Sequence, residues 1–192
     1  MKRNKIVCFL VLLLMTLSFC IGGCSPKKAT EEESSMPPAQ EKNTFTAGDT
    51  LVYENLCEIT WVSDDEITML APTDPGITYN YYEAKEDHVY LHIKLNVKNI
   101  SSEAVHLSDM ISVYATYRNK YRYVAFSVLP EKGEEDFLLA TEKEIPPLVT
   151  TEMHALIEVD KRTAADKKKE FSIEVAAQEY TLAETESAPE PN

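Results

Sequence analysis

The chain has 192 residues, which is room for one domain or two very small ones. Its 32 acidic and 19 basic residues give a net charge of −13, so it lacks the basic surface that nucleic acid or anionic lipid would need. Four cysteines are too few for a disulfide-stapled scaffold. Two of the five glycines lie in the N-terminal segment and the other three are far apart, so they form no glycine-rich phosphate loop.

The first 24 residues have the pattern of an export signal. A basic head, residues 1–5, precedes an uncharged apolar run over residues 6–21 that is short for a membrane span. The segment Ile21-Gly22-Gly23-Cys24 resembles the lipobox of bacterial lipoproteins. That resemblance implies a signal peptide over residues 1–23, cleavage after Gly23 and a thioether-linked lipid on Cys24, which would anchor the chain stably. The alternatives are an ordinary signal peptide and an uncleaved anchor.

Residues 24–47 are rich in Pro, Ser, Glu and Lys, and Met36 and Phe45 are their only large apolar residues. Such a segment cannot bury enough surface to offset its ordering entropy, so we predict a lipidated N-terminus followed by a disordered tether. Residues 183–192 are expected to be a disordered acidic tail for the same reason. This leaves residues 48–182 as one folded domain.

Alternation of apolar and polar residues dominates that domain. Between Val89 and Val97 every odd position is aliphatic, which predicts a long strand with one buried face and one face in water. The same alternation recurs at residues 57–61, 111–117, 124–128, 153–159 and 171–175. Only residues 162–170 have the pattern of a short helix, and strands do not alternate with helices. The sequence therefore predicts an all-β antiparallel sandwich of about seven to eight strands.

Residues 48–182 resemble the immunoglobulin-like domain of unknown function that occurs in secreted lipoproteins of Gram-positive bacteria. The features that carry the resemblance are Gly48-Asp49-Thr50 before a first strand pair, Val97-Lys98-Asn99 at the end of a long strand, a hairpin over residues 111–123, and Pro146 before the strand at residues 151–159. The resemblance implies an immunoglobulin-like sandwich and supplies no catalytic residue. Arg118-Asn119-Lys120 and Pro147 depart from the family pattern, so the loops there are expected to differ in shape.

No constellation of residues indicates a metal site. The histidines are His88, His92, His106 and His154, and we expect them on solvent-facing positions. His88 and His92 stand on one strand face, but roughly 13 Å apart, too far for one metal ion to bridge. Acidic clusters at residues 64–66, 83–87 and 131–136 lack the spacing of a calcium loop and are expected to be solvated loops, with a calcium site as the open alternative.

No residue pattern indicates catalysis or a cofactor either. Cys57 is the one cysteine of the predicted domain, and it shares its strand parity with Ile59 and Trp61. We expect it to be buried, with no general base beside it. Met153 lies on the apolar parity of its strand and is expected in the core.

Tyrosines and cations are concentrated in one hairpin, which we predict as the interaction surface: Tyr114, Arg118, Tyr121, Arg122 and Tyr123. Ordinary cross-strand Tyr–Arg pairing is the alternative interpretation.

The functional prediction is a lipoprotein on the extracytoplasmic face of the cell membrane. Its domain would be a non-enzymatic binding module for another envelope protein or a wall polymer. A small-ligand or metal-handling accessory lipoprotein is the alternative, and a catalytic role comes third.

Overall fold

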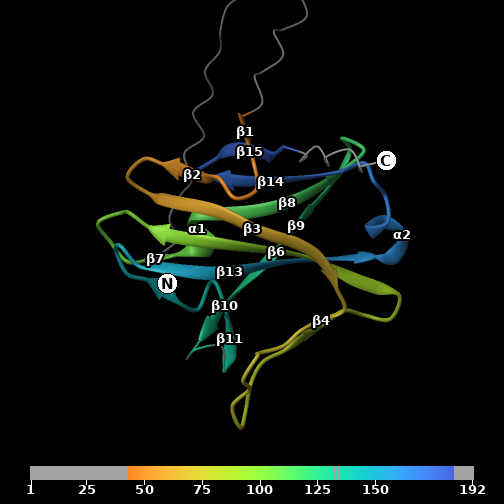
Figure 1. The fold of residues 1–192 in the computed structure, drawn as a ribbon, viewed down its shortest axis with the longest axis horizontal. Coiled ribbons are helices and arrows are strands. Elements are labelled where there is room, and N and C mark those ends of the chain that lie inside the picture. The colour runs from red at the N-terminus through yellow and green to blue at the C-terminus, as the bar shows by residue number, and fades with distance from the viewer. Residues whose placement is uncertain (1–42, 132, 134, 184–192) are drawn as a thin grey trace, which may run out of the picture. The chain divides into compact units, whose positions relative to one another are not determined.

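The computed structural model describes residues 43–131, 133 and 135–183 (Figure 1). The larger of its two main sheets consists, in spatial order, of β11 (Asp136–Leu139), β10 (Phe126–Glu131), β13 (Thr150–Asp160), β6 (His88–Asn99), β3 (Cys57–Ile67) and β2 (Thr50–Tyr53). The smaller sheet consists of β1 (Asn43–Phe45), β15 (Gln178–Leu182), β14 (Lys169–Val175), β8 (Ile111–Tyr117) and β9 (Tyr121–Val124).

Short elements connect these sheets. The two-stranded pairs are β7 (Val105–His106) with β12 (Glu144–Ile145) and β4 (Met69–Leu70) with β5 (Tyr82–Glu83). The helices are α1 (Leu107–Met110) and α2 (Lys161–Ala164). The predicted all-β sandwich is confirmed, and its described strands pair antiparallel except for β1 with β15. The structure divides it more finely than the predicted seven to eight strands, because several short edge strands carry no alternation that the sequence could reveal.

Trp61 lies at the centre of the core between the two sheets. Its ring is 5.8 Å from that of Phe45 on β1 and 5.7 Å from that of Phe171 on β14, so β3 contacts the opposite sheet through aromatic packing. Cys57 and Met153 are fully buried in the same core, as predicted. Burial on this scale is the main force that holds the sandwich together.

The outer face of the six-stranded sheet is not uniformly wet. In β6 every residue from Val89 to Ile93 is buried, and β13 has a similar run from Met153 to Ile157. A second apolar cluster covers this face, made of Leu70, Tyr90, Val128, Phe137 and Leu156. The predicted one-sided strand is therefore wrong for the middle of β6, because apolar side chains from β4, β5 and the edge strand β11 join the cluster on this face.

Strand β3 contains a bulge that reverses which residues face the core. Trp61 pairs with Leu95 but Ser63 pairs with Lys94, so Val62 is an extra residue. Before the bulge Cys57, Ile59 and Trp61 point inward; after it, the alternation is reversed. The bulge turns Asp65 to the outer face, opposite His92 on β6.

Asn99 ends β6 with a buried side chain that joins three backbone segments. Its Nδ2 donates to the carbonyl oxygens of Glu103 and Ile145, each at 2.8 Å, and its Oδ1 accepts from the backbone N–H of Ser101 at 2.9 Å. The turn predicted at this point is therefore organised by one amide side chain.

Two predicted boundaries are wrong. Residues 43–47, assigned to the tether, belong to the fold, because β1 pairs parallel with β15 and Phe45 is buried. The helix predicted over residues 162–170 is only α2, which begins after the N-cap Asp160, and residues 169–170 already belong to β14. Residues 24–42 and 184–192, the rest of the predicted tether and of the tail, lie outside the described residues.

Candidate functional site

The predicted interaction hairpin is formed by β8 and β9, and β9 is the last strand at one edge of its sheet. Tyr117 pairs with Tyr121 across a loop of three residues, closed by a 3.0 Å hydrogen bond from Lys120 N to Tyr117 O. Arg118 and Asn119 both have positive φ angles, 52° and 54°. Asn adopts this conformation readily, whereas Arg does so only when its surroundings hold it there.

Arg122 organises the outward side of this hairpin. Its guanidinium carbon lies 3.6 Å from the centre of the Tyr114 ring, and its Nη2 lies 3.3 Å from Glu174 and 3.4 Å from Glu179. The arrangement ties β9 to β14 and β15. Tyr114 and Arg122 therefore make a diagonal cross-strand contact of the Tyr–Arg kind that the alternative interpretation expected, on the outer face of the sheet.

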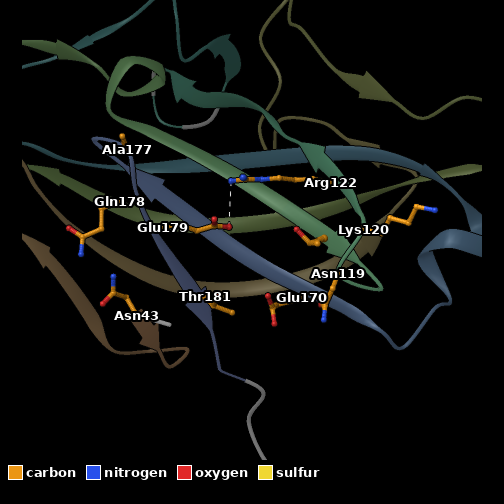
Figure 2. Close-up of a pocket in the computed structure, with 10 residues that line it drawn as sticks. Asn43, Asn119, Lys120, Arg122, Glu170, Ala177, Gln178, Glu179 and Thr181 are labelled. Atoms are coloured by element: carbon orange, nitrogen blue, oxygen red, sulfur yellow. Dashed lines mark ion pairs between the residues drawn. The ribbon is translucent and has the colours of Figure 1, made fainter. Parts of the chain in front are cut away.

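A shallow groove of about 940 Å³ runs over that outer face (Figure 2). Arg122 and Glu179 point toward one another at its middle. Apart from Ala177, the residues that line it have polar or charged side chains: Asn43, Thr116, Asn119, Lys120, Arg122, Glu170, Ala177, Gln178, Glu179 and Thr181. The groove thus combines both charges with amides and hydroxyls, contributed by strands far apart in the sequence.

Tyr121 and Tyr123 alternate with Arg122 and therefore lie on the opposite side of β9. There Tyr123 packs edge-on against Tyr117, with ring centres 5.7 Å apart, and Arg118 donates through Nε to Asp166 at 2.7 Å. A hollow of about 320 Å³ lies beside them, lined by Tyr117, Arg118, Tyr121, Tyr123, Arg162, Thr163 and Asp166. The five predicted residues are therefore divided between the two sides of one hairpin.

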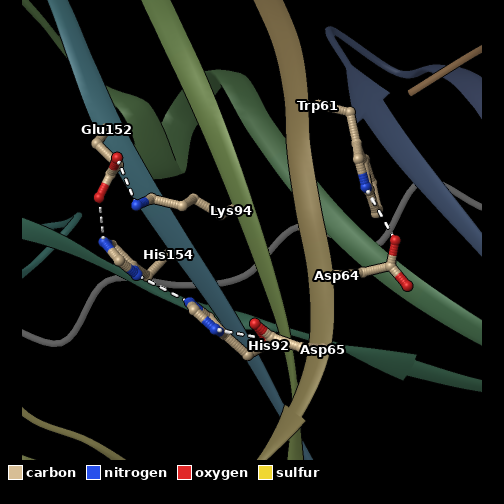
Figure 3. A network of polar contacts seen from close by, with 7 residues as sticks. All are labelled: Trp61, Asp64, Asp65, His92, Lys94, Glu152 and His154. Carbon is tan, nitrogen blue, oxygen red and sulfur yellow. Dashed lines mark hydrogen bonds and ion pairs between the residues drawn. The ribbon is translucent and has the colours of Figure 1, made fainter. Parts of the chain in front are cut away.

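A polar network that the sequence did not reveal crosses the other sheet (Figure 3). His92 Nε2 and His154 Nδ1 are 2.8 Å apart, and the two rings are parallel to within 3°. At one end His92 Nδ1 faces Asp65 Oδ1 at 3.4 Å; at the other His154 Nε2 lies 2.8 Å from Glu152, which Lys94 contacts at 2.9 Å. We call these five residues the histidine network.

The expectation that these histidines face solvent is wrong for two of them. His92 and His154 are both buried, and Phe137 packs edge-on against His154 at 5.2 Å. Burial lowers the pKa of both rings. For His154, repulsion by a charge on His92 lowers the pKa further. Burial works to raise the pKa of Glu152, but the contacts with Lys94 and His154 hold it below its ordinary value.

The acidic cluster at residues 64–66 lies on β3 and is not a solvated loop. Asp64 accepts a hydrogen bond from Trp61 Nε1 at 3.2 Å, Asp65 faces His92, and Glu66 pairs with Lys169 on the opposite sheet at 3.0 Å. Each carboxylate therefore has a separate partner. Among the described residues no group of three or more His, Cys, Asp or Glu side chains converges on a position for a metal ion.

Cys57 has the environment of a structural thiol. It is free and buried, and burial raises the pKa of its thiol to about 11. A thiol of that pKa is almost entirely protonated at neutral pH and is a poor nucleophile. Cys24, the predicted lipid attachment site, lies outside the described residues.

No protein-family model and no curated protein matches the chain. Among solved structures, it is similar to an uncharacterized β-sandwich protein from Clostridium difficile 630. That likeness has 21% identity and a TM-score of 0.67, and it covers 78% of this chain and 100% of that one. A conserved hypothetical protein from Bacillus anthracis is 17% identical with a TM-score of 0.47, over 71% of this chain and 92% of its own. The first likeness shows the fold alone.

Within residues 43–131, 133 and 135–183, none of the helices has the length and apolarity to cross a membrane.

Proposed function

We propose that the chain is an extracytoplasmic lipoprotein whose β-sandwich is a non-enzymatic binding module, with the β8–β9 hairpin as its contact surface. The anchor rests on the sequence Ile21-Gly22-Gly23-Cys24 behind an apolar run. The predicted tether would keep the domain within reach of partners at the cell envelope.

The observation that carries the binding role is the exposure of the hairpin between two hollows. Tyr121 is 52% exposed and Val124 is 62% exposed, on opposite sides of the edge strand β9. Beside them Arg118 and Arg122 are already held in place by acidic partners. Tyrosine and pre-positioned arginine next to exposed apolar surface are the composition that protein interfaces favour.

The same geometry favours a protein partner over a wall polymer. Sugars stack on open aromatic faces, but the ring of Tyr114 is covered by Arg122 at 3.6 Å. The ring of Tyr121 also has a cation over it, Lys120 Nζ at 5.0 Å. The hairpin therefore offers charge and aromatic edges, which suit the side chains of a protein.

The proposed contact surface is tested by photo-crosslinking in living cells. Photoreactive residues are placed at positions 121 and 124, with position 52 on β2 as the control, because Val52 is similarly exposed, at 54%, in the other sheet. We expect a discrete protein adduct from positions 121 and 124 but not from 52. Glycan adducts would contradict the protein partner, and labelling equal to that at position 52 would contradict the hairpin as the surface.

Single substitutions separate binding from stability. Tyr121→Ala is expected to abolish partner capture while the free energy of unfolding changes by less than about 0.5 kcal/mol, because the side chain is exposed. Tyr81→Ala is the matched control, since Tyr81 is 55% exposed on the segment between β4 and β5. Equal loss of capture in both variants would contradict a specific role for the hairpin.

The anchor has its own test. Cys24→Ser is expected to move the protein from the membrane fraction to the soluble fraction, because the acceptor of the lipid is lost. Cys20→Ser, which changes a cysteine inside the apolar run, is expected to leave the protein with the membrane. Retention of the Cys24→Ser variant in the membrane would mean that residues 6–21 are themselves the anchor.

A further inference from the structure

The histidine network is a continuous chain of polar contacts across three strands, from Asp65 on β3 through His92 on β6 to His154 and Glu152 on β13, where Lys94 of β6 closes it (Figure 3). Protons can be assigned to it by elimination. A nitrogen pair at 2.8 Å requires one N–H donor and one bare acceptor, and a neutral imidazole has one of each.

The assignment starts at Glu152. Lys94 holds this carboxylate ionised at 2.9 Å, so Nε2 of His154, at 2.8 Å, must carry a hydrogen and donate to it. Nδ1 of a neutral His154 is then bare and accepts from Nε2–H of His92. Nδ1 of His92 is left without a hydrogen.

The structure leaves that same atom without a partner. Nδ1 of His92 is buried and has no hydrogen bond among the described residues, yet it faces the Oδ1 of Asp65 at 3.4 Å. Two acceptors therefore confront each other at one end of an otherwise complete chain. Such an arrangement lacks one hydrogen.

We propose that the histidine network is a proton-binding site that takes up one proton, and only one, at Nδ1 of His92. Uptake converts the contact between two acceptors into an N–H bond donated to Asp65, with the positive charge between two carboxylates. The proton comes from solvent along Asp65, whose side chain is 53% exposed. A second proton would have to enter at Nδ1 of His154, where it would point two N–H groups at each other across 2.8 Å.

The charges around the two histidines determine the pH at which the proton is taken up. Asp65 from β3 and Glu152 from β13 favour the cation, Lys94 from β6 opposes it, and Phe137 from β11 adds no charge. Burial also opposes the cation and lowers the pKa of both rings, so the proton is bound below the ordinary range of histidine. The site would therefore bind its proton only at a pH below that at which an ordinary histidine does so. This inference does not depend on the proposed function.

The test is a titration of the full chain by NMR with ¹⁵N-labelled histidine rings, in which bare and protonated nitrogens are distinguished directly. His88 and His106, which lie outside the network, are the internal references. We expect one nitrogen of the pair, Nδ1 of His92, to change from bare to protonated on acidification, while Nδ1 of His154 stays bare. Protonation of both rings, uptake at His154, or no change before acid unfolding would each overturn the proposal.

Two neighbouring carboxylates supply a matched pair of variants. Asp65→Asn removes the charge that faces Nδ1 and is expected to move the midpoint of His92 to lower pH by about one unit. Asp64→Asn removes the adjacent carboxylate, which accepts from Trp61 instead, and is expected to leave the midpoint in place. Equal shifts in both variants would show a general effect of charge and would overturn the assignment to Asp65.

Discussion

Asp65 lies opposite His92 because Val62 is an extra residue in β3. Without this bulge, the alternation that buries Cys57 and Trp61 would turn Asp65 toward the core. The bulge instead places its carboxylate 3.4 Å from His92 Nδ1, on the outer face of the sheet. One residue of register thus determines whether the buried histidine pair has an acidic neighbour.

Acidification is expected to destabilise the fold through His92 and His154. Burial keeps the pKa of each ring below the ordinary value, so the unfolded chain binds protons at a higher pH than the folded chain. The free energy of unfolding should therefore fall as the pH drops through about 6.5, and fall less steeply once His92 binds its proton in the folded chain. The expected slope is about 1.4 kcal/mol per pH unit for each proton that only the unfolded chain binds.

Urea unfolding between about pH 7.5 and pH 5.5 measures this slope above the range where most carboxylates titrate. The double variant His92→Leu, His154→Leu should lose it, because both buried titrating rings are gone. His106→Gln, outside the network, should keep it. An unchanged slope in the double variant would assign the pH dependence to other groups.

The thiol of Cys57 is expected to resist modification in the folded protein. Burial raises its pKa to about 11, so about one thiol in a thousand is ionised at about pH 8. Alkylation followed by peptide mapping should leave the Cys57 peptide unmodified in buffer and modify it fully in guanidinium. Rapid alkylation under native conditions would mean that β3 opens locally, because no reagent can reach a fully buried sulfur otherwise.

The alternating pattern of the sequence was sufficient to predict the long strands. The sequence predicts β6, β8 and β13 because apolar residues recur at every second position in them, and the same parity predicts that Met153 lies in the core. Parity could equally have shown that Arg122 points away from Tyr121 and Tyr123. The alternation along β9 therefore predicts which of these side chains share a side of the hairpin.

The histidine network could not be predicted in this way, because it depends on contacts between distant segments. The bulge at Val62 has no sequence signature, and the ring that packs against His154 belongs to Phe137 on the edge strand β11. Strand β1 was missed for a related reason. Three residues carry too little pattern, and only pairing with β15 identifies them as a strand.

Asn99→Ala is expected to lower the free energy of unfolding by about 2 kcal/mol, because the buried carbonyl of Ile145 and the backbone N–H of Ser101 lose their hydrogen bonds to the Asn99 side chain. Asn96→Ala is the matched control on the same strand, since Asn96 is exposed, and should change it by less than about 0.5 kcal/mol. Chemical denaturation of both variants measures the difference. Equal effects would mean that the Asn99 side chain does not organise the end of β6.

Phe45→Ala tests whether the folded domain begins at β1. Its ring is buried 5.8 Å from that of Trp61, and its carbonyl accepts a 2.8 Å hydrogen bond from Ala183. Removing the ring should lower the free energy of unfolding by about 3 kcal/mol, because it opens a cavity beside Trp61. Thr44→Ala, one residue earlier and exposed, should cost less than about 0.5 kcal/mol in the same denaturation experiment. If Phe45→Ala changed the free energy of unfolding as little as Thr44→Ala, the fold would begin after residue 47, and β1 would contribute nothing to its stability.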